Sequence, residues 1–425
     1  MTYMVVAGVR YYIYMNNFWH DLPQPFFVLA PMEAVTDVVF RHVVARAGAP
    51  DIYFTEFTNA TGWVHAGEKA IGGRLLKTDD EQPIVAQIWG GEPGDMEQLA
   101  AHCRELGYHG IDINMGCPAK SAIKSGGSAL IRNPELATQA IAAAKTAGLP
   151  VSVKTRLGYT RIDEWHDWLA HLLRQDIVNL TIHLRTKKEM SKVPAHHELI
   201  PGIIALRDQL APHTLLTING DIADRAHGLE LTAKYPGING IMIGRGVFHN
   251  PFCFVDTSPA SAATPARVTR GGAAPDYFSS DEEIVGADRV AGHVPRPRNF
   301  TIANQLASEG SLADSRRLSS PESSDLRAEH AGGGAGDDGS GGERGLSSDW
   351  MLKRVQHDEL RSIDLLFYHL DLFDQYQEQL HRPFETLKRF FKIYIRDFDG
   401  AADLRDQLMH TKSTDEVRAA LVNHR

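Results

Sequence analysis

The residues with the clearest potential for chemistry form a cysteine turn, Asn114-Met115-Gly116-Cys117-Pro118, at the end of the apolar run Gly110–Asn114. The run is typical of a buried strand, and the glycine and proline are typical of the turn that ends it. A thiol in such a turn would stand at the rim of a sheet, where loops meet a ligand. A second loop, Lys124–Ser128, is rich in glycine and permits close approach of backbone or substrate. Cys117 is therefore either a reactive group or a small buried residue. A single cysteine is more often the latter.

Eight short apolar runs alternate with longer amphipathic segments between residues 26 and 255. The runs are predicted strands: Phe26–Met32, Ile52–Phe57, Ile84–Trp89, Gly110–Asn114, Val151–Arg156, Leu180–Arg185, Leu215–Asn219 and Gly240–Gly244. Several are apolar throughout, as expected of parallel strands covered on both faces. Helical spacing of apolar residues predicts two of the intervening helices, at Asp95–Leu106 and Pro134–Ala147.

Eight strand–helix units in this length predict an α/β fold, the (β/α)₈ or TIM barrel. A doubly wound open sheet is the alternative. A dinucleotide-binding sheet of that kind would carry a glycine-rich fingerprint after its first strand, where this chain has Ala30-Pro31-Met32-Glu33. The barrel is therefore the favoured architecture.

The active site of such a barrel lies at the C-terminal ends of its strands. Polar or titratable residues stand at nearly every predicted end: Pro31 with Met32, Glu56, Gln87, Asn114 with Cys117, Lys154 with Arg156, His183 with Arg185, Asn219-Gly220-Asp221 and Gly244-Arg245-Gly246. Any one of them alone is more simply explained as a hydrogen-bonded rim residue. The whole set on one rim predicts a functional site.

Two of these strand ends indicate a phosphate group. The loops Asn219–Asp221 and Gly244–Gly246 follow the seventh and eighth strands, the usual phosphate site of this fold. Their glycines let backbone N–H groups approach an anion, and the arginine between the last two can grip it with two hydrogen bonds. Lys154 and His183 would place positive charge beside a ring that becomes anionic, and Gln87 can both donate to and accept from a heterocycle. These features together indicate flavin mononucleotide (FMN).

The motifs taken together resemble those of the tRNA-dihydrouridine synthases. The resemblance runs from about residue 26 to 255 and resumes from about 359 to the end, and it rests on six segments: Ala30–Met32, Asn114–Lys120, Ser152–Arg156, His183–Lys187, Asn219–Asp221 and Gly244–Gly246. Dihydroorotate dehydrogenases share parts of the flavin site but not this whole set. The resemblance implies an FMN-dependent, NADPH-consuming enzyme that reduces the C5–C6 double bond of selected uridines in tRNA.

The resemblance also implies roles for individual residues. Cys117 would be the general acid that protonates uracil C5 after reduced flavin delivers hydride to C6, and a thiol is largely protonated at neutral pH. Asn114 would hold the uracil, and Arg156 and Arg185 are expected to contact the substrate. The expected FMN ligands are Pro31, Met32, Glu33, Gln87, Lys154, His183, Asn219, Gly220, Asp221, Gly244 and Arg245.

The C-terminal residues, 349–425, are predicted to form a small helical domain. Lys388, Lys392 and Arg396 are spaced by four and would share one face of a helix. On spacing alone a solvated face explains them. The resemblance favours tRNA binding, because the C-terminal helical domain of this family cradles tRNA, and such contacts to the backbone are largely independent of base sequence.

Two segments fall outside these domains. Residues 1–25 are an N-terminal extension to which we assign no function. Residues 256–348 are rich in Gly, Ser, Ala, Pro, Asp and Arg. They are predicted to be a disordered insertion between the FMN-binding barrel and the C-terminal helices. Because 15 acidic and nine basic residues lie between Asp256 and Trp350, most of the net charge of −9 lies there. Whole-chain charge therefore says little about an RNA-binding surface.

Composition limits the remaining possibilities. The three cysteines, Cys103, Cys117 and Cys253, are too few and scattered for a disulfide framework or a zinc cluster, so we expect a reducing compartment and no metal. No apolar stretch is long enough to span a membrane and no signal-peptide pattern is present, which predicts a cytoplasmic protein.

Two other functions stay open: a flavin-dependent reductase of a free pyrimidine, against which the basic helix argues, and a non-catalytic tRNA-binding protein, against which Cys117 argues.

Overall fold

A computed structural model describes seven segments of the chain: residues 3–6, 9–12, 17–71, 73–119, 122–124, 126–256 and 348–424. The barrel and the C-terminal helices belong to one compact unit. Of the predicted disordered insertion, only its first and last residues, Asp256 and Ser348, are described, so that prediction lies outside the described residues. No helix in these segments is both long and apolar enough to cross a bilayer.

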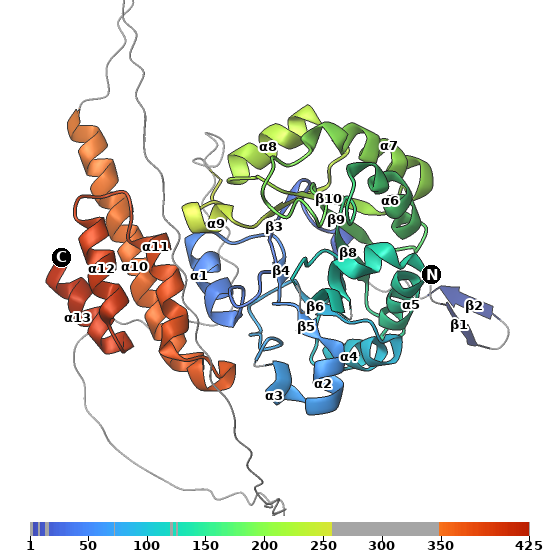
Figure 1. Ribbon diagram of the computed structural model, residues 1–425, viewed down its shortest axis with the longest axis horizontal. Helices are drawn as coiled ribbons and strands as arrows, with labels where there is room; N and C mark the ends of the chain where they lie inside the picture. The colour runs from blue at the N-terminus through green and yellow to red at the C-terminus, as the bar shows by residue number, and fades with distance from the viewer. Residues whose placement is uncertain are drawn as a thin grey trace, which may run out of the picture. The chain divides into compact units, whose positions relative to one another are not determined.

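Eight parallel strands form the barrel, neighbouring one another in the order β3-β11-β10-β9-β8-β7-β6-β4 (Figure 1). Their bounds are β3 Phe26–Leu29, β4 Tyr53–Phe54, β6 Ile84–Trp89, β7 Gly110–Asn114, β8 Val151–Arg156, β9 Asn179–His183, β10 Leu215–Asn219 and β11 Gly240–Ile243. A parallel bridge between Val28 and Ile52 joins β3 to β4 and closes the cylinder. The predicted (β/α)₈ barrel is confirmed.

Helices alternate with the strands around the outside of the barrel (Figure 1). They are α1 Val38–Gly48, α2 Ala60–Ala66, α3 Glu68–Ile71, α4 Pro93–Glu105, α5 Pro134–Lys145, α6 Trp165–Leu173, α7 Ile200–Leu210, α8 Arg225–Lys234 and α9 Gly246–His249. Local sequence explains where several begin. Asp37 caps α1 by accepting from the Phe40 N–H at 2.9 Å, and Asn133 caps α5 directly before a proline at its first position.

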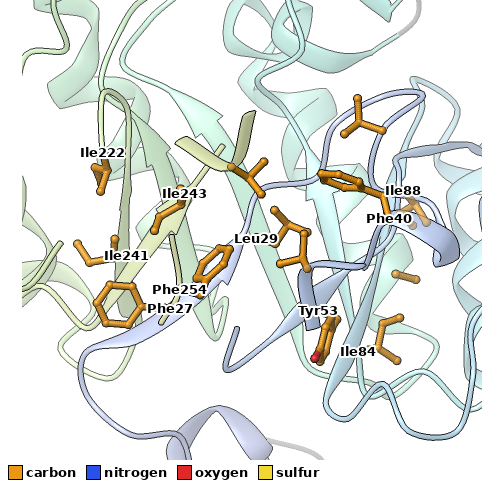
Figure 2. Close-up of a cluster of buried hydrophobic side chains, with 14 of the residues drawn as sticks. Phe27, Leu29, Phe40, Tyr53, Ile84, Ile88, Ile222, Ile241, Ile243 and Phe254 are labelled. Atoms are coloured by element: carbon orange, nitrogen blue, oxygen red, sulfur yellow. The ribbon is translucent and has the colours of Figure 1, made fainter. Parts of the chain in front are cut away.

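Two apolar layers hold the barrel together. The outer layer lies between strands and helices, and it includes alternate strand residues such as Phe27, Leu29, Ile241 and Ile243 together with Phe40 of α1 (Figure 2). The inner layer lies inside the barrel, and its members are Trp19, Phe26, Val28, Ala30, Ile52, Phe54, Val85, Leu215 and Met242. The N-terminal extension thus has a structural part, because Trp19, on the 3₁₀ turn Phe18–His20, closes the barrel floor with 1% of its surface exposed. Before it, β1 Tyr3–Val6 and β2 Val9–Tyr12 form an antiparallel hairpin.

The interior changes from apolar to polar toward the ends of the strands. On β6, Val85 belongs to the inner apolar layer, whereas Gln87 two residues later is buried and hydrogen bonded. On β10, Leu215 is likewise followed by Thr217 and then Asn219. Since alternate residues of a strand face the same side, the inward faces of β6 and β10 are apolar where the strands begin and polar where they end.

Some predicted strand ends differ from the observed ones. The first strand ends at Leu29 rather than Met32, because Pro31 has no N–H and the Met32 N–H donates to the Thr36 hydroxyl at 2.9 Å. The second predicted strand, Ile52–Phe57, is reduced to β4, and a short β5 at Thr58–Asn59 pairs further along β6. Between β4 and β5 the Gln87 N–H donates to the Thr55 hydroxyl at 3.0 Å, which interrupts the ladder. The observed ends of the predicted strands Leu180–Arg185 and Gly240–Gly244 differ from the predicted ends by at most two residues.

The C-terminal residues form helices α10 Ser348–Leu380, α11 Phe391–Tyr394, α12 Ala401–His410 and α13 Thr414–His424. One expectation is wrong here. Lys388 lies in a 3₁₀ segment, Phe384–Phe390, Lys392 lies in α11, and Arg396 follows the end of α11. The three residues therefore do not share one face of a regular helix, because a 3₁₀ segment has three residues per turn and α11 ends at Tyr394.

Candidate active site

The C-terminal ends of the strands border a cavity of about 440 Å³. Nine of the predicted cofactor residues line it: Pro31, Met32, Lys154, His183, Asn219, Gly220, Asp221, Gly244 and Arg245. Ser191 and His249 line it as well and were not expected from the sequence. Strand ends that lie far apart in the sequence are thus brought together as the barrel geometry requires.

The loops after β10 and β11 approach each other closely. A Cβ atom on Gly246 would lie 2.2 Å from the carbonyl oxygen of Ala223, so no larger residue fits there. Gly220 has a φ of +125°, a conformation that side chains rarely adopt. These constraints explain why glycine stands at positions 220 and 246, both of which line the cavity.

Asp221 gathers two arginines at this cavity. Its carboxylate pairs with Arg185 and, at 3.0 Å, with Arg245. Burial acts to raise the pKa of Asp221, but the hydrogen bonds from Arg185 and the Ala195 N–H outweigh it, and the pKa lies below its ordinary value. The Nη1 atom of Arg185 is buried and has no hydrogen-bond partner in the described part of the chain. A Cβ on Gly220 would lie 3.8 Å from that Nη1, so a buried N–H donor with no hydrogen-bond partner lies close to this lining residue.

Lys154 and His183 add further polar groups to the cavity. The Lys154 Nζ donates to the Asn219 Oδ1 at 3.3 Å. Burial, and then the charge of Arg156, lowers the pKa of Lys154 to about 8. Burial also lowers the pKa of His183 well below its ordinary value, with Arg156 and Lys154 adding to the effect. At neutral pH the lysine is therefore mostly charged, whereas the imidazole is neutral.

The turn that carries Cys117 is held rigidly. The Oδ1 of Asn114 accepts from the N–H groups of Gly116 and Cys117 at 3.0 and 2.9 Å. The Cys117 carbonyl oxygen accepts from the Ser128 N–H at 3.1 Å. Gly127 has a φ of +56°, and a Cβ there would lie 3.1 Å from the Cys117 carbonyl oxygen. The glycine loop predicted after the cysteine turn therefore packs against it.

Cys117 differs from the other two cysteines. Cys103 and Cys253 are buried in the outer apolar layer, whereas Cys117 is partly accessible. Burial is the main reason that the pKa of Cys117 is raised, and the negative charge of Glu33 adds to it, while Arg156 and Lys154 act in the opposite direction. The side chain is therefore a protonated thiol at neutral pH.

The other expected site residues make contacts of their own. Glu33 forms an ion pair with Arg74, and Gln87 is hydrogen bonded inside the barrel. Neither is among the cavity-lining residues. The Arg156 Nε donates to the Gly116 carbonyl oxygen at 2.8 Å, which ties β8 to the cysteine turn. Arg185 is buried behind Asp221, with its Nε also donating to the Val193 carbonyl oxygen.

The three basic residues expected to bind tRNA lie in the C-terminal helices. Lys392 and Arg396 border one surface hollow together with Arg405 of α12. Lys388 and Lys392 border a neighbouring one, which Arg405 also lines. The Lys388 Nζ donates to the Met409 carbonyl oxygen at 2.9 Å, and Arg396 donates to the His249 carbonyl oxygen at 2.6 Å. The residues are thus brought together through tertiary packing, and Arg405 is a member that sequence spacing did not reveal.

A buried ion cluster at the rim was missed by the sequence analysis. Arg382 pairs with Glu56 at 2.5 Å and with Asp37 at 2.8 Å. Burial raises the pKa of Glu56 to about 7, although Arg382 lowers it. The only sequence signal was the position of Glu56 at a strand end, and its partner lies 326 residues away.

The fold and this site define a barrel enzyme with a ligand cavity at the last two strand ends and a protonated cysteine on the loop after β7. A family model described as dihydrouridine synthase (Dus) matches residues 28–270. The chain is 46% identical to a protein named probable tRNA-dihydrouridine synthase 2 from Bacillus subtilis, over 96% of each chain. It is 44% identical to a probable tRNA-dihydrouridine synthase from Staphylococcus aureus, over 96% of this chain and 95% of the other. The chain belongs to the dihydrouridine synthase family.

Proposed function

We propose that this protein is a tRNA-dihydrouridine synthase that reduces the C5–C6 double bond of selected uridines in tRNA, with NADPH as the source of electrons and FMN as the flavin, in the cytoplasm. Family membership and the names of the relatives support this assignment. The observation that carries the chemistry is the Cys117 thiol, which is kept protonated by burial on a turn fixed by Asn114.

The cavity residues fit FMN. A phosphate needs several N–H donors and positive charge, and the two glycine loops, Arg245 and the unpaired Nη1 of Arg185 offer both. Lys154, His183, Pro31 and Met32 line the same cavity and would hold the flavin ring. Bound FMN supplies the hydride for uracil C6. Glu33 and Gln87 stay predictions as direct ligands, since their observed partners lie elsewhere.

The role of Cys117 follows from the chemistry of uracil. The C5–C6 double bond is conjugated to the C4 carbonyl, so hydride addition at C6 leaves negative charge that a proton at C5 neutralises. The Sγ–H of Cys117 gives that proton, because its raised pKa keeps it protonated at neutral pH. The positive charges of Arg156 and Lys154 stabilise the thiolate that is left behind, since both act to lower the cysteine pKa.

The C-terminal helices would hold the tRNA while one base reaches the barrel. Lys388, Lys392, Arg396 and Arg405 border two adjoining hollows and would contact phosphates, which gives salt-dependent affinity with little sequence preference. The target uridine must leave its stack at a cost of a few kcal/mol, which favours a base in a loosely held loop.

Among the expected substrate contacts, Asn114 and Arg156 hold the cysteine turn and Arg185 holds Asp221, so we infer positioning roles for these three.

The test is to map dihydrouridine in tRNA from cells with and without this protein, and to repeat the reaction with purified protein, NADPH and unmodified tRNA. Loss of dihydrouridine at defined positions in the deletion strain, and its return in vitro, is the expected result. Reduction of free pyrimidines with tRNA left unmodified would instead support a small-molecule reductase, and tRNA binding without reduction would support a non-catalytic protein.

A further inference from the structure

A continuous chain of hydrogen bonds leads from a buried carboxylate in the barrel to the cysteine turn. The Gln87 Nε2 donates to the Asp112 Oδ2 at 2.6 Å. The Gln87 Oε1 accepts from the Asn114 Nδ2 at 3.2 Å. The Asn114 Oδ1 then accepts from the N–H groups of Gly116 and Cys117. The chain thus passes through two side-chain amides, each of which uses its nitrogen on one side and its oxygen on the other.

The two ends of this chain fix the orientation of both amides. At one end stand two backbone N–H groups, which can only donate. At the other end stands Asp112, which is fully buried and is an acceptor at both oxygens when ionised, with the second oxygen accepting from the Ser152 hydroxyl at 2.6 Å. Burial raises the pKa of Asp112 to about 6, so the carboxylate form still predominates at neutral pH. If either amide were rotated by 180°, two donors or two acceptors would face each other in a buried site.

We propose that Asp112 is a positioning residue, which acts through Gln87 and Asn114 to hold the Cys117 turn in the geometry that proton transfer needs. The proposal deepens the proposed function and rests on Cys117 as the proton donor. Asp112 lines no part of the cavity and bonds to residues that hold the turn rather than to the turn itself. Its effect would therefore fall on the step that uses the thiol and not on the binding of tRNA.

Two substitutions at Asp112 separate its hydrogen-bond acceptor from its charge. Asp112→Leu removes both, so the Gln87 amide loses the partner that fixes it. Asp112→Asn removes the charge but keeps one oxygen for Gln87, because the Ser152 hydroxyl can turn and accept from the new amide. The electrostatic effect of Asp112 on Lys154 is lost in both variants. A difference between them therefore reports on the acceptor alone.

The experiment measures single-turnover formation of dihydrouridine by the pre-reduced holoenzyme. Asp112→Leu is expected to lower the rate about ten- to hundredfold, with KM for tRNA and flavin reduction by NADPH within about twofold of wild type. Asp112→Asn should keep the rate within about threefold. Thr217→Val, which removes a buried hydroxyl that donates to Asn179 elsewhere in the barrel, is the matched control and should resemble wild type.

A second readout does not depend on turnover. Alkylation of Cys117 by iodoacetamide, followed by peptide mass spectrometry, should be faster in Asp112→Leu than in wild type and unchanged in Asp112→Asn, because a loosened turn exposes the thiol. If Asp112→Leu does not fold, Gln87→Met, which removes the middle of the chain, should show the same faster alkylation. Equal losses in the leucine and asparagine variants, or wild-type rates in both, would overturn the proposal. Full activity of Cys117→Ala would instead overturn the proposed function on which it rests.

Discussion

Arg382, in the loop after α10, places its guanidinium against Glu56 and Asp37 at the barrel rim, with the Nη2 atom 2.5 Å from the Glu56 Oε2. The Glu56 side chain is fully buried, and its Oε1 has no hydrogen-bond partner among the described residues. This cluster ties the C-terminal helices to the barrel, and removal of the arginine would leave two carboxyl groups buried without their cation.

Arg382 should contribute strongly to the stability of the fold. Arg382→Ala should lower the free energy of unfolding by about 3 kcal/mol, measured by urea denaturation, because breaking a buried ion pair leaves an uncompensated charge. Arg161 and Asp163 form an exposed pair with side chains 72% and 68% accessible, and Arg161→Ala as a control should leave the free energy of unfolding nearly unchanged. Equal effects of the two substitutions would show that the buried cluster does not hold the helices to the barrel.

The pH dependence of proton donation follows from the raised pKa of Cys117. A general acid works only while it is protonated, so the rate of single-turnover reduction should stay level through neutral pH and fall as pH rises through the cysteine pKa, above the ordinary value of 9.0. Stopped-flow measurement with pre-reduced enzyme checks this. A fall that begins below pH 8 would indicate a thiol with a lowered pKa, contrary to the burial seen here.

Lys154 should make FMN affinity depend on pH. Its pKa is lowered to about 8 by burial, so the free protein loses this positive charge as pH rises through that value, and affinity for the anionic ligand should weaken by a few fold between pH 7 and 9. Titration of apoprotein by quenching of FMN fluorescence measures the affinity. Lys154→Met should bind more weakly at pH 7 and show a flatter profile. A profile that is unchanged in this variant would remove Lys154 from the flavin site.

The hollow bordered by Lys392, Arg396 and Arg405, which Asp397 and Asp399 also line, should contribute to tRNA binding. Lys392 is exposed and forms no hydrogen bond or ion pair within the described part of the chain, so it is the most available cation there. Lys392→Glu should weaken tRNA binding about three- to tenfold and make the salt dependence shallower, with flavin reduction by NADPH unchanged. Filter binding at several salt concentrations measures both effects.

The matched control for Lys392 is Arg174→Glu. Arg174 is exposed and directly follows the last residue of α6. The C-terminal ends of the barrel helices lie at the end of the barrel opposite the active-site mouth. This charge reversal should leave tRNA affinity within about twofold of wild type. If both reversals weakened binding equally, net charge rather than the hollow would be responsible.

The barrel could be predicted from the sequence because each of its strands is marked by a short run of apolar residues. Continuous apolar runs define strands such as Gly110–Asn114 and Val151–Arg156, and the strand order of this fold then brings Lys154, Asn219 and Arg245 to one cavity. Contacts between distant segments were not predictable in the same way. No periodicity links Arg382 to Glu56, and the hydrogen bonds that occupy both ends of the Gln87 and Asn114 amides emerge only when β6 and β7 are side by side.

The arrangement of the C-terminal basic residues could not be predicted from their spacing in the sequence. Spacing by four predicted one helical face, but the 3₁₀ segment and the early end of α11 break that regularity. Packing of α12 nevertheless brings Arg405 to the same hollow. Residue type therefore indicated the chemistry of this surface, whereas its geometry depended on tertiary contacts.

The most direct test of the central claim is single-turnover reduction of tRNA by Cys117→Ala. The variant should retain FMN and accept electrons from NADPH at the wild-type rate, because Cys117 is not among the cavity-lining residues. Dihydrouridine formation, measured by mass spectrometry of the tRNA, should fall about 10²- to 10⁴-fold, the usual contribution of a general acid. Formation of dihydrouridine at the wild-type rate would contradict the account.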